Sequence, residues 1–352
     1  MEFTKKKKIL AYGVSIGLLF VNTGNDTINF ILYALSMVPL AFMLGEITSD
    51  ISTYIGEKKG GLLTATVGNL PEILMSFWSI KLGLIPMVKA AIVGSIVNNM
   101  LLVLGISIFI GGIKFKEQKF NRNIAKTNFK MLLLVISSMV IMECINSYGT
   151  ISEKVLVNIS VAVSILLIVI YILGLVFSIY THSSLFNEGE IKKTSGKLFC
   201  KELVYLFIEL ALITVIINFA SEAVIGHASI LIKQYNISQT FMGIILIPLL
   251  GNIGENISAI VCAYKNKVNI SLEIAVGSSL QMGLFAAPVL VLASFIIGIP
   301  MALVFSMLHI IIVGIAILVA YAVFADGKTY WFEGTILIAI YIIITICYFF
   351  VV

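Results

Sequence analysis

The sequence of 352 residues contains little charge: only 12% of its residues are Asp, Glu, Lys or Arg, against 60% that are hydrophobic. Soluble domains carry charge on roughly a quarter of their residues, so this composition excludes a water-soluble globule. The apolar residues run in stretches of about 20, which is the length of a membrane-spanning helix. They do not alternate with polar residues, and this excludes an outer-membrane β-barrel.

Metal-binding and redox residues are also scarce. The chain has four cysteines and three histidines, with no CxxC pair and no histidine beside another metal ligand. These absences exclude a disulfide framework and give no sign of a zinc site. The sequence also lacks a nucleotide-binding loop and a Ser/His/Asp set, so we expect neither an enzyme nor a cofactor.

Breaks in hydropathy predict an all-α polytopic membrane protein with about 11 transmembrane helices. Lys5 to Lys8 are followed by an apolar run from Ile9 to Val21, but no small-residue cleavage pattern follows, so we expect an uncleaved first helix. The expected spans are 8–22, 28–54, 61–82, 86–112, 124–146, 152–180, 200–233, 239–264, 270–296, 300–323 and 331–352.

Basic residues predict the orientation of these spans, because they concentrate in cytoplasmic loops. With eleven spans, one side of the membrane holds all 23 lysine and arginine residues except Lys81, Lys89, Lys154 and Lys233. The N-terminus is therefore expected in the cytoplasm. The excess of basic residues is explained by their concentration in cytoplasmic loops. We therefore expect a lipid bilayer as partner and no nucleic acid.

Two similar motifs place a glutamate in the middle of an apolar segment. Residues 68–72 read Gly-Asn-Leu-Pro-Glu and residues 251–255 read Gly-Asn-Ile-Gly-Glu. A Gly-Ser pair follows each motif at the same spacing, ending at Ser95 and Ser278, so the offset between the two copies is constant. A carboxylate in hydrocarbon is costly unless it serves a site, so Glu72 and Glu255 predict an ion site near the membrane midplane.

The repeat predicts the domain organisation. Residues 1–25 form an extra N-terminal helix, 26–180 a first five-helix repeat, 181–199 a cytoplasmic loop, and 200–352 a second five-helix repeat. An odd number of helices per repeat gives the two copies opposite orientations. Such inverted repeats are typical of transporters that alternate access to a midplane site.

The polar residues around the two glutamates indicate which ion would bind. Side chains three residues apart share a helix face, and here they supply amide and hydroxyl oxygens only. Oxygen ligands with two carboxylates suit a hard divalent cation, Ca²⁺ before Mg²⁺. The expected ligands are Glu72, Glu255, Asn69, Asn252, Ser95, Asn98, Ser278 and Gln281.

Protons and a divalent cation can each neutralise two buried carboxylates, but both cannot fully occupy the same oxygens. This competition predicts exchange of a cation for protons. From the residues alone, two other classes stay open: an intramembrane enzyme with Glu72 and Glu255 as acid and base, and a passive cation channel.

The motifs resemble those of the calcium/proton exchanger (CAX) family of the cation/Ca²⁺ exchanger superfamily. The likeness lies in residues 60–72, 181–186 and 240–291. It implies export of Ca²⁺ from the cytoplasm in exchange for H⁺, with both ions bound at Glu72 and Glu255, in a bacterial plasma membrane. It further implies that Glu222 helps the ions move. An assembly of several copies stays open.

Three departures from the family pattern affect these expectations. Asn256 stands where the family usually has histidine, and Asn98 is shorter than the usual glutamine. Ser49 stands where the family often has an acid, although Asp50 is next to it. In addition, Leu-Pro-Glu at Pro71 resembles the sodium/calcium exchanger repeats. Exchange of Na⁺ for Ca²⁺, or transport of Mn²⁺ or monovalent cations, therefore stays open.

Overall fold

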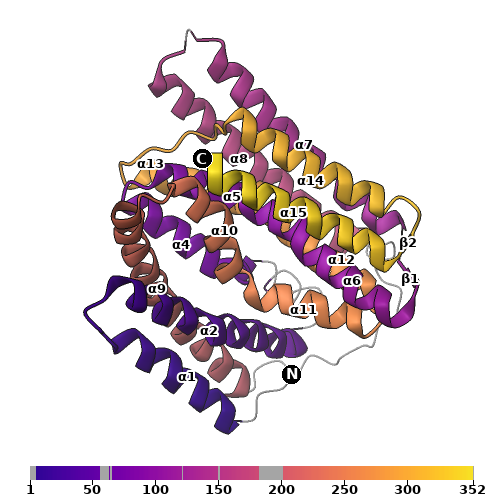
Figure 1. Ribbon diagram of the computed structural model, residues 1–352, viewed down its shortest axis with the longest axis horizontal. Helices are drawn as coiled ribbons and strands as arrows, with labels where there is room; N and C mark the ends of the chain where they lie inside the picture. Colours follow the sequence, from indigo (N-terminus) through magenta and orange to yellow (C-terminus); the bar gives the residue numbers. More distant parts are fainter. Residues whose placement is uncertain are drawn as a thin grey trace.

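The computed structural model describes residues 5–55, 63, 66–120, 122–149, 151–181 and 201–351. The expected cytoplasmic loop 181–199 lies outside these residues apart from Thr181, and the first motif region is described only in part before residue 66. Helices make up most of the described chain (Figure 1).

The helices before residue 181 are α1 (Lys5–Phe20), α2 (Asp26–Ile55), α4 (Leu70–Lys81), α5 (Ile85–Val97), α6 (Leu104–Phe115), α7 (Arg122–Ser147) and α8 (Glu153–Val176). Those after residue 200 are α9 (Lys201–Tyr235), α10 (Gln239–Gly251), α11 (Ile253–Tyr264), α12 (Val268–Gln281), α13 (Ala287–Ile296), α14 (Met307–Val323) and α15 (Trp331–Val351). Three π-helical turns are η1 (Asn98–Val103), η2 (Phe177–Thr181) and η4 (Met282–Ala286).

One short antiparallel ribbon joins two loops that are far apart in the sequence. It consists of β1 (Gln118–Lys119) and β2 (Lys328–Thr329), with Gln118 opposite Thr329. The ribbon ties the connection between α6 and α7 to the connection between α14 and α15. Figure 1 shows it at the right-hand end of the helix bundle.

Seven helical stretches of the described chain are long and apolar enough to cross a membrane, or eight if α10 and α11 count as one bent span. Large apolar side chains such as Leu173, Leu318 and Phe349 are exposed on their outer faces. Such surfaces are stable in lipid and unstable in water, so the chain is an integral membrane protein. The expected count of eleven spans stays a prediction, since α1, α4 and α14 have only 16, 12 and 17 residues.

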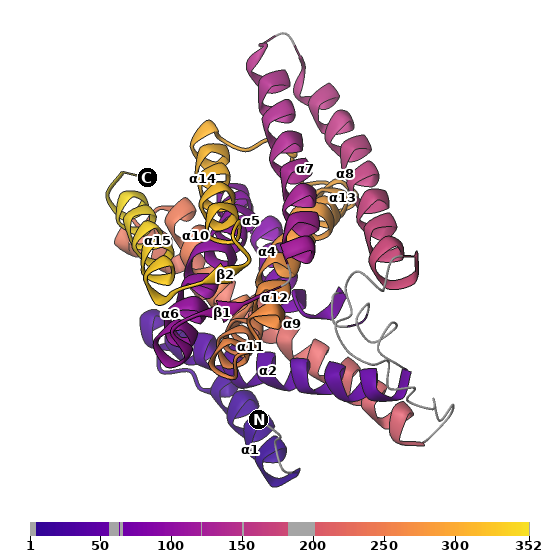
Figure 2. The same cartoon turned by 90° about the vertical axis from the view of Figure 1, so that its right-hand side faces the viewer.

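The buried apolar residues form two separate clusters. In one, α2 packs along α9, with Met37, Leu44 and Ile217 fully or almost fully buried between them and their neighbours α4 and α10. The other cluster joins α5 to α8 with α12 to α15, around residues such as Val93 and Met282. In both views α1, α2 and α9 lie together on one side of the bundle, and α7 and α8 extend away as a hairpin (Figure 1, Figure 2).

Two helices, α4 and α11, begin inside the two motifs. Asn69 and Asn252 are the N-cap residues of α4 and α11, with ψ of 9° and 13°, outside the helical range. Pro71 lies in the first turn of α4, where its missing N–H costs nothing. At Asn252 the chain turns by 64° between α10 and α11. Regular helix is therefore broken at both glycine-containing motifs.

Glycines allow the broken helices to approach one another closely. A Cβ atom on Gly251 would lie 2.7 Å from the Cβ atom of Glu72. Gly94 and Gly243 similarly let the backbones of α5 and α10 touch, at Ile244 and Met87 respectively. Small residues commonly permit such contacts between membrane helices. The close contact at Gly251 brings the second motif directly against the first glutamate.

Candidate ion site

Glu72 is the most enclosed charged residue of the two motifs. It lies in the first turn of α4 and has 0% of its surface exposed. Its Oε2 atom accepts hydrogen bonds from Ser95 Oγ at 3.1 Å and from Asn252 Nδ2 at 2.8 Å. Its Oε1 atom is buried without a hydrogen-bond partner among the described residues. One carboxylate oxygen is therefore held in place, and the other is left for an ion or a proton.

The two asparagines make reciprocal contacts between the halves of the chain. Asn252, from the second motif, donates to Glu72 and also to Ser95 Oγ at 3.1 Å. Asn69, from the first motif, donates to Gln281 Oε1 at 2.7 Å and accepts from Ser278 Oγ at 2.9 Å. Neither asparagine side chain caps its own helix. Each amide instead forms hydrogen bonds with side chains of the other half of the chain, so the two motifs form one polar cluster.

Glu255 lies in the first turn of α11 and is partly exposed. Its Oε2 atom is buried without a hydrogen-bond partner among the described residues. The two glutamates are close enough for the negative charge of Glu255 to act on Glu72. Each also lies at a helix N-terminus, whose positive dipole end favours a negative charge. The two carboxylates thus have different surroundings within one electrostatically coupled site.

Two of the expected amide side chains lie at π-helical turns. Asn98 begins η1 and Gln281 immediately precedes η4. Both Nδ2 and Oδ1 of Asn98 are buried without hydrogen-bond partners in the described part of the chain. A π turn shifts the helix register by one residue, and such turns are frequent at functional sites. Gln281 joins the cluster through its hydrogen bond from Asn69, whereas no hydrogen bond joins Asn98 to it in the described part of the chain.

Asn99 belongs to the cluster although the sequence did not indicate it. Its Nδ2 atom donates to Ser278 Oγ at 3.0 Å, and its side chain is buried. Adjacent residues do not share a face of a regular α-helix. A regular helix that directs Asn98 to the site would therefore direct Asn99 elsewhere. The Asn98-Asn99 pair itself was the only available signal.

Glu222 lies elsewhere on the surface of the bundle. It is exposed on α9, whereas its neighbour Ser221 is buried. No hydrogen bond joins Glu222 to the cluster of Glu72, Asn69, Ser95 and their partners. The structure therefore brings together the expected residues of the two motifs and leaves Glu222 outside their hydrogen-bonded network.

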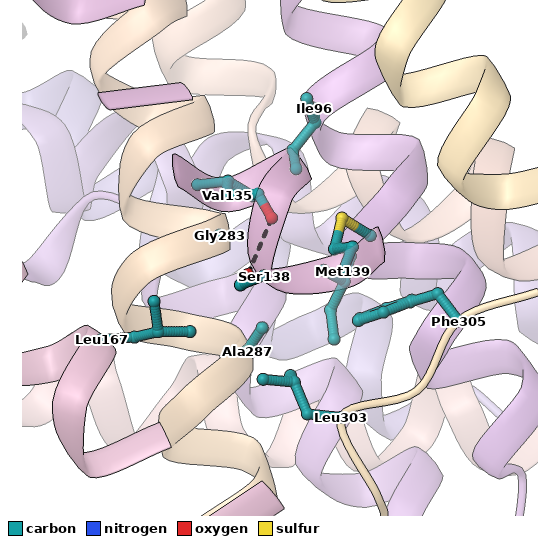
Figure 3. A pocket seen from close by; sticks show the side chains of 10 residues that line it. Ile96, Val135, Ser138, Met139, Leu167, Gly283, Ala287, Leu303 and Phe305 are labelled. Atoms are coloured by element: carbon teal, nitrogen blue, oxygen red, sulfur yellow. Dashed lines mark hydrogen bonds between the residues drawn. The ribbon is translucent and has the colours of Figure 1, made fainter. Parts of the chain in front are cut away.

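A small void beside η4 is a different feature from the polar cluster. It has a volume of about 10 Å³ and lies among Ile96, Met139, Leu167 and Gly283 (Figure 3). The one hydroxyl there, Ser138 Oγ, donates to the carbonyl oxygen of Val135 at 2.7 Å. These surroundings are too apolar to hold an ion.

The donor set of the polar cluster is carboxylate, amide and hydroxyl. Within the described ranges, no three or more His, Cys, Asp or Glu side chains gather in a way that could hold a metal ion. A cation at this site would therefore combine the two carboxylates with neutral oxygens. That chemistry fits a hard cation such as Ca²⁺.

Comparison with known proteins gives the family. The family described as sodium/calcium exchanger protein matches residues 26–180 and again residues 205–350. A Ca²⁺/H⁺ antiporter of Aphanothece halophytica is 38% identical over 334 residues, which cover 91% of this chain and 90% of that protein. The Ca²⁺/H⁺ antiporter ChaA of Bacillus subtilis is 35% identical, with 91% of each chain covered.

Solved structures agree with this assignment. The structure of native YfkE superposes with a TM-score of 0.82 and 32% identity, over 97% of this chain and 99% of that one. The H⁺/Ca²⁺ exchanger CAX has a TM-score of 0.70 at 15% identity, over 98% and 92% of the chains, and shares the fold. The family expected from the motifs is therefore confirmed: the chain belongs to the calcium/proton exchangers within the sodium/calcium exchanger protein family.

Proposed function

We propose that the protein is a secondary active antiporter that exports Ca²⁺ from the cytoplasm in exchange for H⁺. The observation that carries this proposal is the position of Glu72. Its carboxylate is fully buried, is held by Ser95 from its own half and Asn252 from the other half, and keeps one oxygen without a partner among the described residues. The relatives named Ca²⁺/H⁺ antiporters support the choice of ions.

The two glutamates would couple the ions by competition. Two carboxylates of this kind are costly in hydrocarbon unless a divalent cation or protons neutralise them. Ca²⁺ would bind to Glu72 and Glu255 with the amide and hydroxyl oxygens of Asn69, Asn252, Ser95, Asn98, Ser278 and Gln281. Protons on the same carboxylates would release it. If the site can switch from one side of the membrane to the other only when the two carboxylates are neutralised, the protein exchanges Ca²⁺ for protons.

The fold that we propose for this cycle is an inverted repeat with eleven spans. The constant offset between the motifs carries the bounds of α4, residues 70–81, onto those of α11, residues 253–264. It also carries the first residues of α5 and α6 onto those of α12 and α13. The packing is paired in the same way, because α4 contacts α9 as α11 contacts α2, and α6 contacts α15 as α13 contacts α8.

Alternating access requires two groups of helices that can move relative to each other. The two hydrophobic clusters supply such a division, one around α2 and α9 and one around α5 to α8 and α12 to α15. The half-helices α4 and α11, which carry Glu72 and Glu255, contact both groups. Movement of α2 and α9 across these half-helices would open the site to one side and close it to the other.

The proposed orientation has a cytoplasmic N-terminus in a bacterial plasma membrane. The lysine distribution supports it, because Lys81, Lys89, Lys154 and Lys233 are the only basic residues on the opposite side. Glu222, exposed on α9, would then act in the path by which ions or protons reach the site, without binding in the cluster.

Exchange of Na⁺ for Ca²⁺ is the second candidate. The matching family is described as sodium/calcium exchanger protein. The fold also superposes on the sodium–calcium exchanger NCX_Mj with a TM-score of 0.57 at 19% identity, over 96% and 97% of the chains. The two candidates share the carboxylate site and differ in the ion that drives release of Ca²⁺.

Uptake of Ca²⁺ into proteoliposomes with an acidic interior tests the proposal. We expect uptake by the unchanged protein and none by Glu72→Gln or Glu255→Gln. Glu153→Gln is the matched control, because Glu153 is an exposed acid at the start of α8. Full transport by either site variant would refute the two-carboxylate site. Equal uptake without any driving gradient would instead indicate a passive channel.

A further inference from the structure

A cavity of about 420 Å³ lies at one end of the bundle, where α5, α10, α14 and α15 meet. Its walls come from the first turns of α5, α10 and α14 and from the last turn of α15. Pro86, Val304 and Leu308 make part of the wall apolar. The cavity is separate from the residues of the ion site, none of which lines it.

Lys89 is the one charged side chain among the residues that line this cavity. It is partly buried and makes no ion pair or hydrogen bond with any residue in the described ranges. Glu143 on α7 acts on it electrostatically, but that carboxylate accepts a hydrogen bond from Ser147 Oγ at 3.1 Å. A partly buried ammonium group is stabilised by a counter-charge, and the cavity in front of it has room for one.

Further polar groups around the cavity are suited to an anion. Thr240 and Ser306 contribute hydroxyls, and Ser306 Oγ caps α14 by accepting from the backbone N–H of His309 at 3.3 Å. His309 and Tyr348 stack with ring centroids 6.0 Å apart and are only 7% and 1% exposed. The Nδ1 atom of His309 and the hydroxyl of Tyr348 have no hydrogen-bond partners among the described residues.

We propose that this cavity binds a phosphate group, with Lys89 as its counter-charge and the hydroxyls of Thr240, Ser306 and Tyr348 as donors. The apolar wall would accept the uncharged part of an amphiphile, so a phospholipid headgroup is the expected source of the phosphate. The internal offset places Leu272 at the position that corresponds to Lys89. The site would therefore exist in one half of the chain only, unlike the paired ion site.

Binding would join the ends of four helices that belong to both halves of the chain. We expect a phosphatidylglycerol headgroup to raise the midpoint of thermal unfolding of the detergent-purified protein in a saturable manner. A diacylglycerol without phosphate is the matched lipid control. Inorganic phosphate forms a separate arm, and saturation by millimolar phosphate alone would identify the free anion as the source.

Variants distinguish this site from general lipid effects. Lys89→Ala should raise the half-saturating concentration of phosphatidylglycerol at least tenfold, whereas Lys154→Ala, at an exposed lysine of α8, should not change it. Native mass spectrometry should show one phosphatidylglycerol retained by the unchanged protein and by Lys89→Arg, and lost from Lys89→Ala. Equal responses of Lys89→Ala and Lys154→Ala, or no response to either phosphate source, would overturn the proposal.

Discussion

Glu72 and Glu255 occupy equivalent sequence positions but differ in their surroundings. Glu72 is fully buried and accepts two side-chain hydrogen bonds, whereas Glu255 is partly exposed and has one buried oxygen without a partner among the described residues. The sequence predicted the pair because a repeated acid in an apolar segment has few structural explanations. It could not predict the difference, which depends on how the two halves dock.

Replacing Glu72 by glutamine separates ion binding from folding. Removing a negative charge from an apolar setting should not destabilise the fold, so we expect an unchanged midpoint of thermal unfolding without Ca²⁺. The unchanged protein should gain stability on adding Ca²⁺, by about 2.7 kcal/mol at a hundred times its dissociation constant. Glu72→Gln should gain none, while Glu153→Gln should behave like the unchanged protein. Calorimetry would measure both effects, and Ca²⁺ stabilisation of Glu72→Gln would contradict the assignment.

Asn252 positions Glu72 from the opposite half of the chain. Asn252→Ala removes the donor to Glu72 and to Ser95, which leaves buried acceptors unsatisfied at a cost of about 1–3 kcal/mol. We expect Ca²⁺ affinity to fall roughly 5- to 150-fold, since about 1.4 kcal/mol corresponds to a factor of ten. Asn158→Ala, at an exposed position of α8, is the control. Unchanged affinity in equilibrium ⁴⁵Ca²⁺ binding by Asn252→Ala would show that its amide does not serve the site.

The broken helices depend on close contacts that involve glycine. The glycines and the proline of the motifs favour a break in the helices near residues 71 and 254, but they do not indicate which atoms meet there. Contact between Gly251 and Glu72 joins residues from different halves, and a pattern within one helix contains no information on such a pairing. The same holds for Asn99, whose contact with Ser278 depends on a π turn.

Adding a methyl group at Gly251 should displace the first glutamate. The new Cβ would lie 2.7 Å from Glu72 Cβ and 3.0 Å from its Cα, so the half-helix α4 must shift. Gly251→Ala should therefore lower the rate of Ca²⁺ transport at least tenfold. In Gly314→Ala the new Cβ meets no atom within 4 Å, so that variant should transport normally. Comparable transport by both variants in proteoliposomes would contradict the close docking of the two motifs.

The ribbon of β1 and β2 fixes the far end of α11. Gln118 Nε2 donates to the carbonyl oxygen of Ala263 at 2.8 Å and to Asn266 Oδ1 at 3.1 Å. Glu117 beside it is partly exposed, and its hydrogen bond from Tyr330, with the nearby ammonium group of Lys328, holds its pKa below the ordinary value. These contacts join loops that are far apart in the sequence, so local patterns could not predict them.

Loss of the Gln118 side chain should loosen α11. Its amide is buried and satisfies a helix-end carbonyl, so Gln118→Ala should lower the free energy of unfolding by about 1–3 kcal/mol. Lys119→Ala is the neighbouring control, because the Lys119 side chain is 81% exposed. Thermal unfolding of the two variants measures the difference, and equal midpoints would show that the ribbon does not support α11.

At the scale of the whole molecule, helix bounds in the two halves of the described chain correspond, and side chains of the two motifs meet in one polar cluster. The apolar composition and the paired motifs made the membrane class and the family predictable from the sequence. The inverted repeat and the ion-binding role of the motif residues stay predictions. The number of membrane-spanning helices was less predictable. A short or broken helix has fewer apolar residues than the roughly 20 that mark a complete span in a hydropathy profile. Glu72 has one hydrogen-bonded carboxylate oxygen and one without a partner among the described residues. This arrangement depends on how the two halves of the chain pack together, so the sequence could not predict it.

The central claim is that protons drive Ca²⁺ through this site. The most direct test is Ca²⁺ uptake into acid-loaded proteoliposomes in sodium-free buffer, with the membrane voltage clamped and Glu72→Gln measured in parallel. We predict uptake that a protonophore abolishes and that Glu72→Gln lacks. Uptake that begins only when an outward Na⁺ gradient is supplied, and that ignores the pH gradient, would contradict proton coupling.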